Sequence, residues 1–248
     1  MQLSKYSASG NDFVIFHTFH KKDRTELAKR LCNRFNGIGA DGLIVIVPHH
    51  DFSFEWQFYN ADGSEAAMCG NGSRAAAHYA FKEGLAPAQM KFLTGAGVIT
   101  ANVDGDIVES ELTLPNIFRE SMEEEGRTWF FVDTGVPHLV TEMQDYNEYD
   151  QALCTVMRHR HNANVNYVME QDGVLYVRTY ERGVEDETLA CGTGMAAAFL
   201  YMNRLGRVGE SAKVYPPSKE ELTLRTEGGK LFLKGSVINV FDVVQKLK

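Results

Sequence analysis

A short phrase built around a cysteine occurs twice in this 248-residue chain. Residues 66–75 read AAMCGNGSRA and residues 188–197 read TLACGTGMAA, so each copy has a cysteine, a Gly-x-Gly segment and alanines. Cys69 and Cys191 lie 122 residues apart, close to half the length of the chain. This self-similarity constrains the fold more than any other feature, because it predicts that one structural unit is present twice.

Other segments keep nearly the same offset. GNDFV begins at Gly10 and GVPHLV begins at Gly135, 125 residues later, and Tyr59 before the first phrase matches Tyr180 before the second. A chance likeness between two Gly/Ala-rich helix starts, the alternative, does not explain one offset kept over several segments. We therefore expect two homologous halves related by pseudo-twofold symmetry, with both cysteines facing one cleft between them.

The rest of the chain alternates strand-like and helical segments. Apolar runs predict many short strands, and three hairpins are expected at Asp104-Gly105, Asp172-Gly173 and Gly228-Gly229. The acidic run ESMEEEGR near the middle is expected to be a solvated linker. Apolar residues at helical spacing, including Leu27, Leu31 and Phe35 in the first segment, predict helices over residues 23–35, 72–84, 147–160 and 192–206.

Composition excludes several classes of protein. The chain is 44% hydrophobic and 23% charged, which is typical of a globular protein. Its formal net charge of −8, without a dense basic run, argues against nucleic acid or an anionic membrane as a partner. The N-terminus lacks the order of a signal peptide, and the longest apolar run, residues 43–47, is too short to span a bilayer. We expect a soluble, cytoplasmic protein.

The four cysteines are expected to be thiols, because a reducing compartment does not favour a disulfide framework. No CxxC pair and no Cys/His ligand spacing is present, so no structural metal is expected. No nucleotide loop, metal cluster or lysine site for pyridoxal phosphate (PLP) is evident, and the chemistry is expected to need no cofactor. A lone cysteine is most often a buried small hydrophobe, which is the interpretation for Cys32 and Cys154.

The duplicated cysteines have a different interpretation. Each precedes a Gly-x-Gly that opens a predicted helix, where unpaired N–H groups and the helix dipole stabilise a thiolate or a carboxylate. Glycine lets the backbone approach a ligand closely. If a carboxylate lay between two such helix starts, one thiolate would remove a proton from the adjacent carbon and the opposite thiol would deliver one to its other face. That reaction inverts a stereocentre.

These motifs resemble those of the diaminopimelate epimerases. The segments SGNDFV, GIGADGL, YNADGSEAAMCGNGSRAAA and ERGVEDETLACGTGMAAA carry the resemblance, which covers essentially the whole chain. It implies an isomerase that interconverts LL- and meso-diaminopimelate without PLP, for lysine and peptidoglycan synthesis. It also implies an α+β fold of two similar halves, each a mixed sheet curled into a barrel around a central helix, and a homodimer. The halves are expected at residues 1–116, completed by a last strand at about 237–248, and 117–236.

The resemblance also implies roles for individual residues. Cys69 and Cys191 would be the acid/base pair, and Asn60 and Glu181 would orient the ammonium group of the reacting centre. His138 resembles an auxiliary histidine beside the site and is expected to pair with Glu181. The N–H groups that would hold the reacting carboxylate belong to Gly70, Asn71, Gly192 and Thr193. The side chains that would bind the distal end of the substrate are those of Asn11, Asn164 and Arg182.

Alternatives remain at several of these positions. The asparagines can be turn residues, Glu181 and Arg182 a surface ion pair, and His138 a structural histidine. Many members of the family have Asn where Val136 stands, and some have Gln where Gly42 stands, which leaves open a racemase of the same fold with another amino acid substrate, such as proline. A redox-sensing dithiol formed by Cys69 and Cys191, or a non-catalytic binding protein, is the alternative from another class.

Overall fold

The computed structural model describes residues 1–245 and divides into two compact units. Unit 1 contains Met1–Glu111 and the segment that begins at Lys234, and unit 2 contains Leu112–Leu233. Each unit is an α+β structure of many strands and few helices. Residues 246–248 of the expected last strand lie outside the described residues. Among residues 1–245, no helix is long and apolar enough to cross a membrane.

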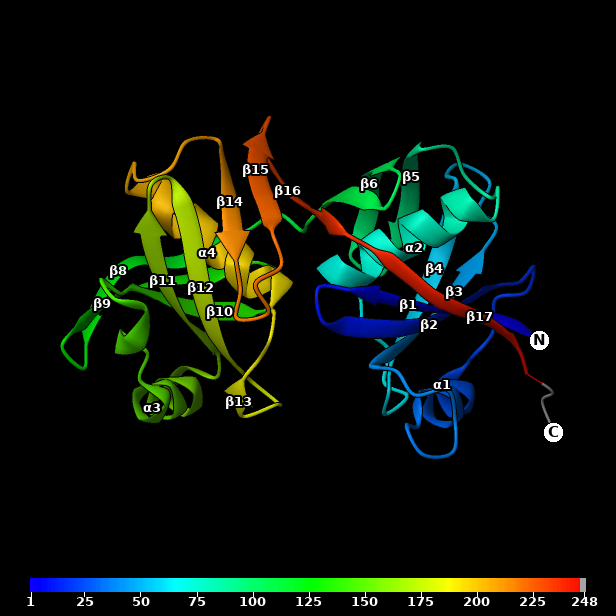
Figure 1. The fold of residues 1–248 in the computed structure, drawn as a ribbon, viewed down its shortest axis with the longest axis horizontal. Coiled ribbons are helices and arrows are strands. Elements are labelled where there is room, and N and C mark those ends of the chain that lie inside the picture. Colours follow the sequence, from blue (N-terminus) through cyan, green and yellow to red (C-terminus); the bar gives the residue numbers. More distant parts are fainter. Residues whose placement is uncertain (246–248) are drawn as a thin grey trace. The chain divides into compact units, whose positions relative to one another are not determined.

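Unit 1 is a mixed sheet that begins with the C-terminal strand of the chain. β17 pairs antiparallel with β1, and the order continues through β2, β3, β4, β5 and β6 to β7 (Figure 1). The β2–β3 and β4–β5 pairs are parallel. The elements of unit 1 are β1 (Gln2–Ala8), β2 (Asn11–His17), α1 (Thr25–Cys32), β3 (Gly42–Val47), β4 (Phe54–Asn60), α2 (Gly70–Lys82), β5 (Gln89–Thr94), β6 (Gly97–Asp104), β7 (Ile107–Glu111) and β17 (Ile238–Val244).

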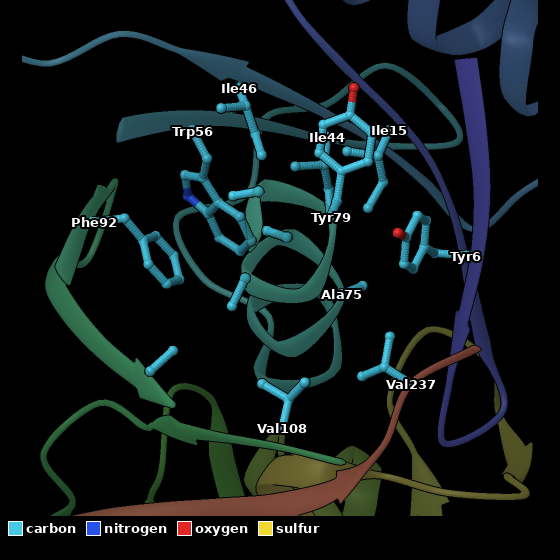
Figure 2. Close-up of a cluster of buried hydrophobic side chains, with 14 of the residues drawn as sticks. Tyr6, Ile15, Ile44, Ile46, Trp56, Ala75, Tyr79, Phe92, Val108 and Val237 are labelled. Atoms are coloured by element: carbon cyan, nitrogen blue, oxygen red, sulfur yellow. The ribbon is translucent and has the colours of Figure 1, made fainter. Parts of the chain in front are cut away.

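Helix α2 is the centre of this unit. Ala75, Ala76 and Ala77 are fully buried, and their small side chains allow strands to pack closely around the helix. Figure 2 shows side chains from several strands directed at α2 from different sides, among them Ile15, Ile44, Trp56, Phe92 and Val108, together with Val237 from the link between β16 and β17. The surrounding sheet therefore fixes the position of α2, including its N-terminal end.

Unit 2 follows the same plan. Its strand order is β8, β9, β10, β11, β12, β14 and β15, and β10–β11 and β12–β14 are the parallel pairs. Its elements are β8 (Asn116–Glu124), β9 (Arg127–Asp133), β10 (Pro137–Glu142), η1 (Tyr146–Glu148), α3 (Gln151–His161), β11 (Asn164–Gln171), β12 (Val174–Glu181), β13 (Asp186–Glu187), α4 (Gly192–Arg204), β14 (Ser211–Tyr215) and β15 (Leu222–Glu227); β16 (Lys230–Ser236) runs from unit 2 into unit 1.

The two units repeat one topology. In each, a parallel crossover through a helix is followed by a hairpin and a second parallel crossover through a central helix, which is α2 in unit 1 and α4 in unit 2. The central helices begin at Gly70 and Gly192, 122 residues apart, so the spacing of the cysteine phrases is the spacing of two equivalent helix starts. The predicted repeat and α+β class are confirmed.

Two local predictions are wrong. The first helix ends at Cys32 because the backbone of Asn33 is extended, so Phe35 lies outside the helix and is 95% exposed. The acidic run at residues 120–127 is a β-hairpin of β8 and β9 instead of a linker, and Glu124 pairs there with Arg160 and His161. All three predicted hairpin turns lie between consecutive strands.

Candidate active site

The first half-site surrounds the N-terminus of α2. Cys69 is the N-cap residue of this helix, with an extended backbone, and its Sγ accepts a hydrogen bond from the Gly72 N–H at 3.3 Å. A Cβ on Gly72 would lie 3.3 Å from Cys69 Cβ and 3.5 Å from its Sγ, so glycine leaves space at the sulfur. The first turn holds no acidic residue, and its N–H groups favour a thiolate at Cys69.

Asn71 joins this helix start to β2. Its Nδ2 donates to Asn11 Oδ1 at 2.8 Å, and its Oδ1 accepts from the Arg74 guanidinium at 2.7 Å. Arg74 is fully buried and also donates to Ser9 Oγ at 2.6 Å. Asn11 and Asn71 were both expected at the site, and the structure brings them together. The side chain of Asn71 acts in this network, whereas the prediction concerned its backbone N–H.

An ion-pair cluster holds the other side of Asn11. Asn11 Nδ2 donates to Asp41 Oδ2 at 3.2 Å, and Arg34 donates to Asp41 and, through two nitrogens at 2.9 Å each, to Asp12. Lys5 also pairs with Asp12, at 2.7 Å. Burial alone would raise the pKa of Asp12, but the hydrogen bonds from Arg34 and Lys5 outweigh burial and lower it to about 2. The cluster therefore keeps Asp12 ionised and Asn11 in one orientation.

Asn60 is the last residue of β4 and begins the turn that follows. Its Nδ2 donates to Ser64 Oγ at 3.0 Å, and its backbone N–H donates to the Ser64 carbonyl at 2.8 Å. Asn60 pairs in register with Gly42. A Cβ on Gly42 would lie 2.6 Å from the Phe58 ring, so this ring occupies the space where a side chain at position 42 would begin.

The second half-site surrounds the N-terminus of α4. Cys191 is the N-cap residue, 7% exposed, and its Sγ lies 3.5 Å from Thr193 Oγ1. A Cβ on Gly194 would lie 2.4 Å from Asn166 Oδ1 and 2.8 Å from Thr179 Oγ1. The second glycine of this phrase is therefore required by the close approach of the strands beneath the helix.

His138 on β10 is fully buried beside Thr193. Its Nε2 lies 2.9 Å from Thr193 Oγ1 and 3.3 Å from Asn164 Nδ2, and its Nδ1 lies 3.0 Å from Asn166 Nδ2. Burial lowers the pKa of His138 to about 3, so the imidazole is neutral near physiological pH. His138 lies beside Thr193, another residue predicted for the site, while its auxiliary role and its pairing with Glu181 stay predictions.

Asn164 and Arg182 are held together at the ends of two adjacent strands. The Arg182 backbone N–H donates to Asn164 Oδ1 at 2.7 Å, and its guanidinium donates to the Asn162 carbonyl at 2.9 Å. Glu181 ends β12, and its carbonyl accepts from the Glu185 N–H at 2.8 Å. These contacts place Asn164, Glu181 and Arg182 at one end of β11 and β12.

Sequence reasoning missed Arg74 and Asn166. Asn166 left a usable signal, because residues 164 and 166 alternate along one strand and so share a face with the predicted Asn164. Arg74 left none, because an arginine in an alanine-rich helix is usually exposed, whereas this one is fully buried.

The other residues that could bind a metal or react as thiols do not belong to either half-site. Among the described residues, the group with possible metal-ligand spacing is His49, His50 and Asp51, in the loop that follows β3. Cys32 and Cys154 are buried, and burial raises the pKa of each thiol to about 12. They are therefore packing residues, as predicted.

Comparison with known proteins agrees with these features. The family model described as Diaminopimelate epimerase matches residues 3–115 and 130–240. A diaminopimelate epimerase of Nitratiruptor is 62% identical over 99% of both chains, and one of Campylobacter lari is 54% identical over 98% of both.

A solved structure of another protein shares this fold. A probable proline racemase of Agrobacterium radiobacter, 14% identical, matches with a TM-score of 0.76 over 100% of this chain and 93% of its own. At that identity the likeness concerns the fold alone. The family model and the identity to the curated relatives, each over nearly the full length, show that this chain belongs to the diaminopimelate epimerase family.

Proposed function

We propose that this protein interconverts LL- and meso-diaminopimelate by a two-base mechanism that uses no PLP. The observation that carries the proposal is a cysteine at the N-cap of each of two equivalent central helices. A reaction that must act on both faces of one carbon needs similar chemistry twice, and the duplicated half-sites supply it. The printed names of the curated relatives support diaminopimelate as the substrate.

In this mechanism one cysteine acts as a thiolate. It takes the proton from the α-carbon, so the C–H bond breaks, an S–H bond forms and the electron pair remains on carbon and its carboxylate. The N–H groups of Gly70, Asn71, Gly192 and Thr193 stabilise the resulting negative charge as an oxyanion hole does. The other cysteine, as a thiol, donates its proton to the opposite face. Cys69 and Cys191 exchange roles in the reverse direction.

The remaining site residues orient the substrate. Asn60 and Glu181 are proposed to bind the ammonium group of the reacting centre, while Asn11, Asn164 and Arg182 bind the distal end. A guanidinium suits the distal carboxylate, since it offers two parallel donors. His138 is proposed as an auxiliary residue that acts through its neighbours, because it is fully buried.

We further propose that the enzyme works as a cytoplasmic homodimer in lysine and peptidoglycan precursor synthesis and binds no nucleic acid. Four cysteines present as thiols suit a reducing compartment, and the net charge of −8 disfavours polyanions. Sedimentation analysis of the purified protein tests the dimer: a monomer at all concentrations would contradict it.

Deuterium incorporation tests the reaction. The protein, dialysed against chelator and free of PLP, is incubated in D₂O with LL- or meso-diaminopimelate, and the isomers are separated and weighed by mass spectrometry. We expect one deuterium at one α-carbon of the product, and no turnover with Cys69→Ala or Cys191→Ala. Exchange of proline but not of diaminopimelate, or full activity in either variant, would overturn the proposal.

A further inference from the structure

The hydrogen-bonding partners of His138 determine which of its nitrogens carries the proton. The side chain is fully buried, so each ring nitrogen depends on protein partners. A neutral imidazole has one N–H donor and one acceptor nitrogen. Three polar groups face the ring: the amides of Asn166 and Asn164 and the hydroxyl of Thr193.

The orientation of the Asn166 amide is fixed by a backbone carbonyl. Asn166 Nδ2 lies 2.8 Å from the Leu139 carbonyl oxygen, which can only accept, and Asn166 Oδ1 lies 2.9 Å from Thr179 Oγ1. The group that faces His138 Nδ1 at 3.0 Å is therefore an N–H donor. Because two donors cannot share one hydrogen bond, Nδ1 is the acceptor and the ring proton is on Nε2.

The proton on Nε2 needs an acceptor. Asn164 presents its Nδ2 at 3.3 Å, and this amide is also fixed, because its Oδ1 accepts the Arg182 N–H at 2.7 Å. Thr193 Oγ1 at 2.9 Å is then the acceptor of the Nε2–H. The contact of Asn164 Nδ2 with Nε2, at 3.3 Å the longer of the two, is then not a hydrogen bond in this tautomer.

The Thr193 hydroxyl, once it accepts from His138, has its own hydrogen left to donate. Cys191 Sγ lies 3.5 Å from Thr193 Oγ1, within the range of hydrogen bonds to sulfur. The two helix starts differ in their caps, since Cys69 Sγ accepts from the backbone N–H of Gly72, whereas Cys191 makes no side-chain cap hydrogen bond. A backbone N–H can only donate, whereas a hydroxyl can also accept. Whether the Thr193 hydroxyl donates to Cys191 therefore depends on which ring nitrogen of His138 carries the proton.

We propose that Asn166 is a positioning residue: it holds His138 as the Nε2–H tautomer, which makes the Thr193 hydroxyl a donor to Cys191 Sγ. Asn166 thereby acts on the acid/base group of the second half-site through two intermediate side chains. The role in catalysis rests on the proposed function, but the hydrogen-bond chain itself does not. A hydrogen bond from Thr193 to the sulfur stabilises the thiolate form of Cys191 over the thiol.

Charged groups near this chain come from the end of β12. Arg182 acts on His138 and favours its neutral form, and Glu181 precedes Arg182. Arg182 and Glu181 stay unchanged in the variants proposed below, and Thr193→Val adds no charge, so a change at Cys191 in that variant reports on the hydrogen-bond chain.

Alkylation by iodoacetamide measures the effect without any substrate. The rate at Cys191 is followed against pH by peptide mass spectrometry, and Cys69 in the same molecules serves as the internal control. Asn166→Asp places an acceptor opposite Nδ1 and draws the ring proton there, so Thr193 then donates to Nε2 instead of to sulfur. The added carboxylate also disfavours the Cys191 thiolate, and the uncharged Thr193→Val variant below separates the two effects. We expect the Cys191 pKa to rise by about one unit and its alkylation at about pH 7 to slow about tenfold, with Cys69 unchanged.

A second pair of variants tests the last link in the chain. Thr193→Val removes the hydroxyl and should slow Cys191 alkylation to the same extent, whereas Thr193→Ser keeps a hydroxyl and should stay within about twofold of the wild-type rate. If Asn166→Asp does not fold, this pair of variants still tests whether the Thr193 hydroxyl acts on Cys191. In ¹⁵N-histidine-labelled wild-type protein, nitrogen shifts should identify His138 as protonated at Nε2.

Two results would overturn the inference: an Nδ1–H tautomer of His138, or Cys191 alkylation that Thr193→Val leaves unchanged or lowers only in parallel with Cys69. A protein that fails to epimerise diaminopimelate but shows the expected alkylation shifts would contradict the proposed function and leave this inference intact. The two failures are therefore distinguishable.

Discussion

Asn71 Nδ2 donates to Asn11 Oδ1 at 2.8 Å and so connects the N-terminus of α2 with the start of β2. These residues are 60 positions apart, and both amide orientations are set by neighbours: Arg74 donates to Asn71 Oδ1, and Asp41 accepts from Asn11 Nδ2. The helix end proposed to bind the reacting carboxylate is thereby coupled to a residue proposed to bind the distal end.

Asn71→Ala tests this coupling. The change keeps the backbone N–H of residue 71 but leaves Asn11 without its donor, so Asn11 should lose its fixed orientation. We expect the KM for diaminopimelate to rise about tenfold with a kcat within about threefold, as for one lost hydrogen bond to substrate. Steady-state kinetics check this, with Asn102→Ala on the exposed face of β6 as the control. A wild-type KM in Asn71→Ala would contradict the coupling.

Asp12→Asn tests the ion-pair cluster behind Asn11. Because the folded-state pKa of Asp12 is lowered from 3.8 to about 2, its stabilising effect is present above pH 3.8 and disappears as pH falls to about 2. Wild type should exceed Asp12→Asn in unfolding free energy by about 2 kcal/mol above pH 4, and this difference should shrink towards pH 2.

Urea denaturation at several pH values measures this difference. The exposed Asp51→Asn provides the control, since Asp51 lies in the surface loop after β3. A difference between wild type and Asp12→Asn that stays constant from pH 5 to pH 2 would show that Asp12 contributes by packing alone.

Gly194→Ala tests the close packing beneath α4. A methyl group there would overlap Asn166 Oδ1 and Thr179 Oγ1, at 2.4 Å and 2.8 Å. We expect a loss of about 1–3 kcal/mol of unfolding free energy. Gly72→Ala, whose nearest atom is 3.3 Å away, should cost less, and Gly209→Ala, with nothing within 4 Å, should stay within about 0.5 kcal/mol of wild type. Equal losses for Gly194→Ala and Gly209→Ala would refute the packing argument.

Thiol labelling separates the two kinds of cysteine. Burial raises the pKa of Cys32 and Cys154 to about 12, so few of these thiols are ionised at pH 8. In the native protein we expect a thiol reagent to modify Cys69 and Cys191, and to modify Cys32 and Cys154 only after denaturation. Site-resolved mass spectrometry checks this. Rapid native labelling of Cys154 would contradict its assignment as a packing residue.

The sequence allowed the repeat and both helix starts to be predicted because these features are local. The cysteine phrases identify Cys69 and Cys191 as N-cap residues, and the hairpin turn at Asp172-Gly173 follows from two residues that readily adopt positive φ, here 54° and 77°. Helical spacing failed at Phe35, because the chain already leaves the helix at Asn33. Periodicity carries no information about where a short helix stops.

The side-chain networks depend on tertiary structure, which local patterns do not encode. His138 and Asn164 are neighbours only because β10 and β11 pair in parallel, and Asn166 joins them through a carbonyl of β10. The donor and acceptor roles that set the His138 tautomer follow from those positions, so no spacing in the sequence could reveal them.

The position of solvent deuterium early in the reaction tests the two-base mechanism most directly. LL-diaminopimelate is incubated in D₂O to a few per cent conversion, and product and recovered substrate are analysed separately by mass spectrometry; the experiment is then repeated from the meso isomer. A thiol that donates to the opposite face delivers solvent deuterium, while the abstracted proton returns only to the original face. We predict deuterium in the product and almost none in the recovered substrate, in both directions. Equal early labelling of substrate and product would indicate a single base and contradict the account.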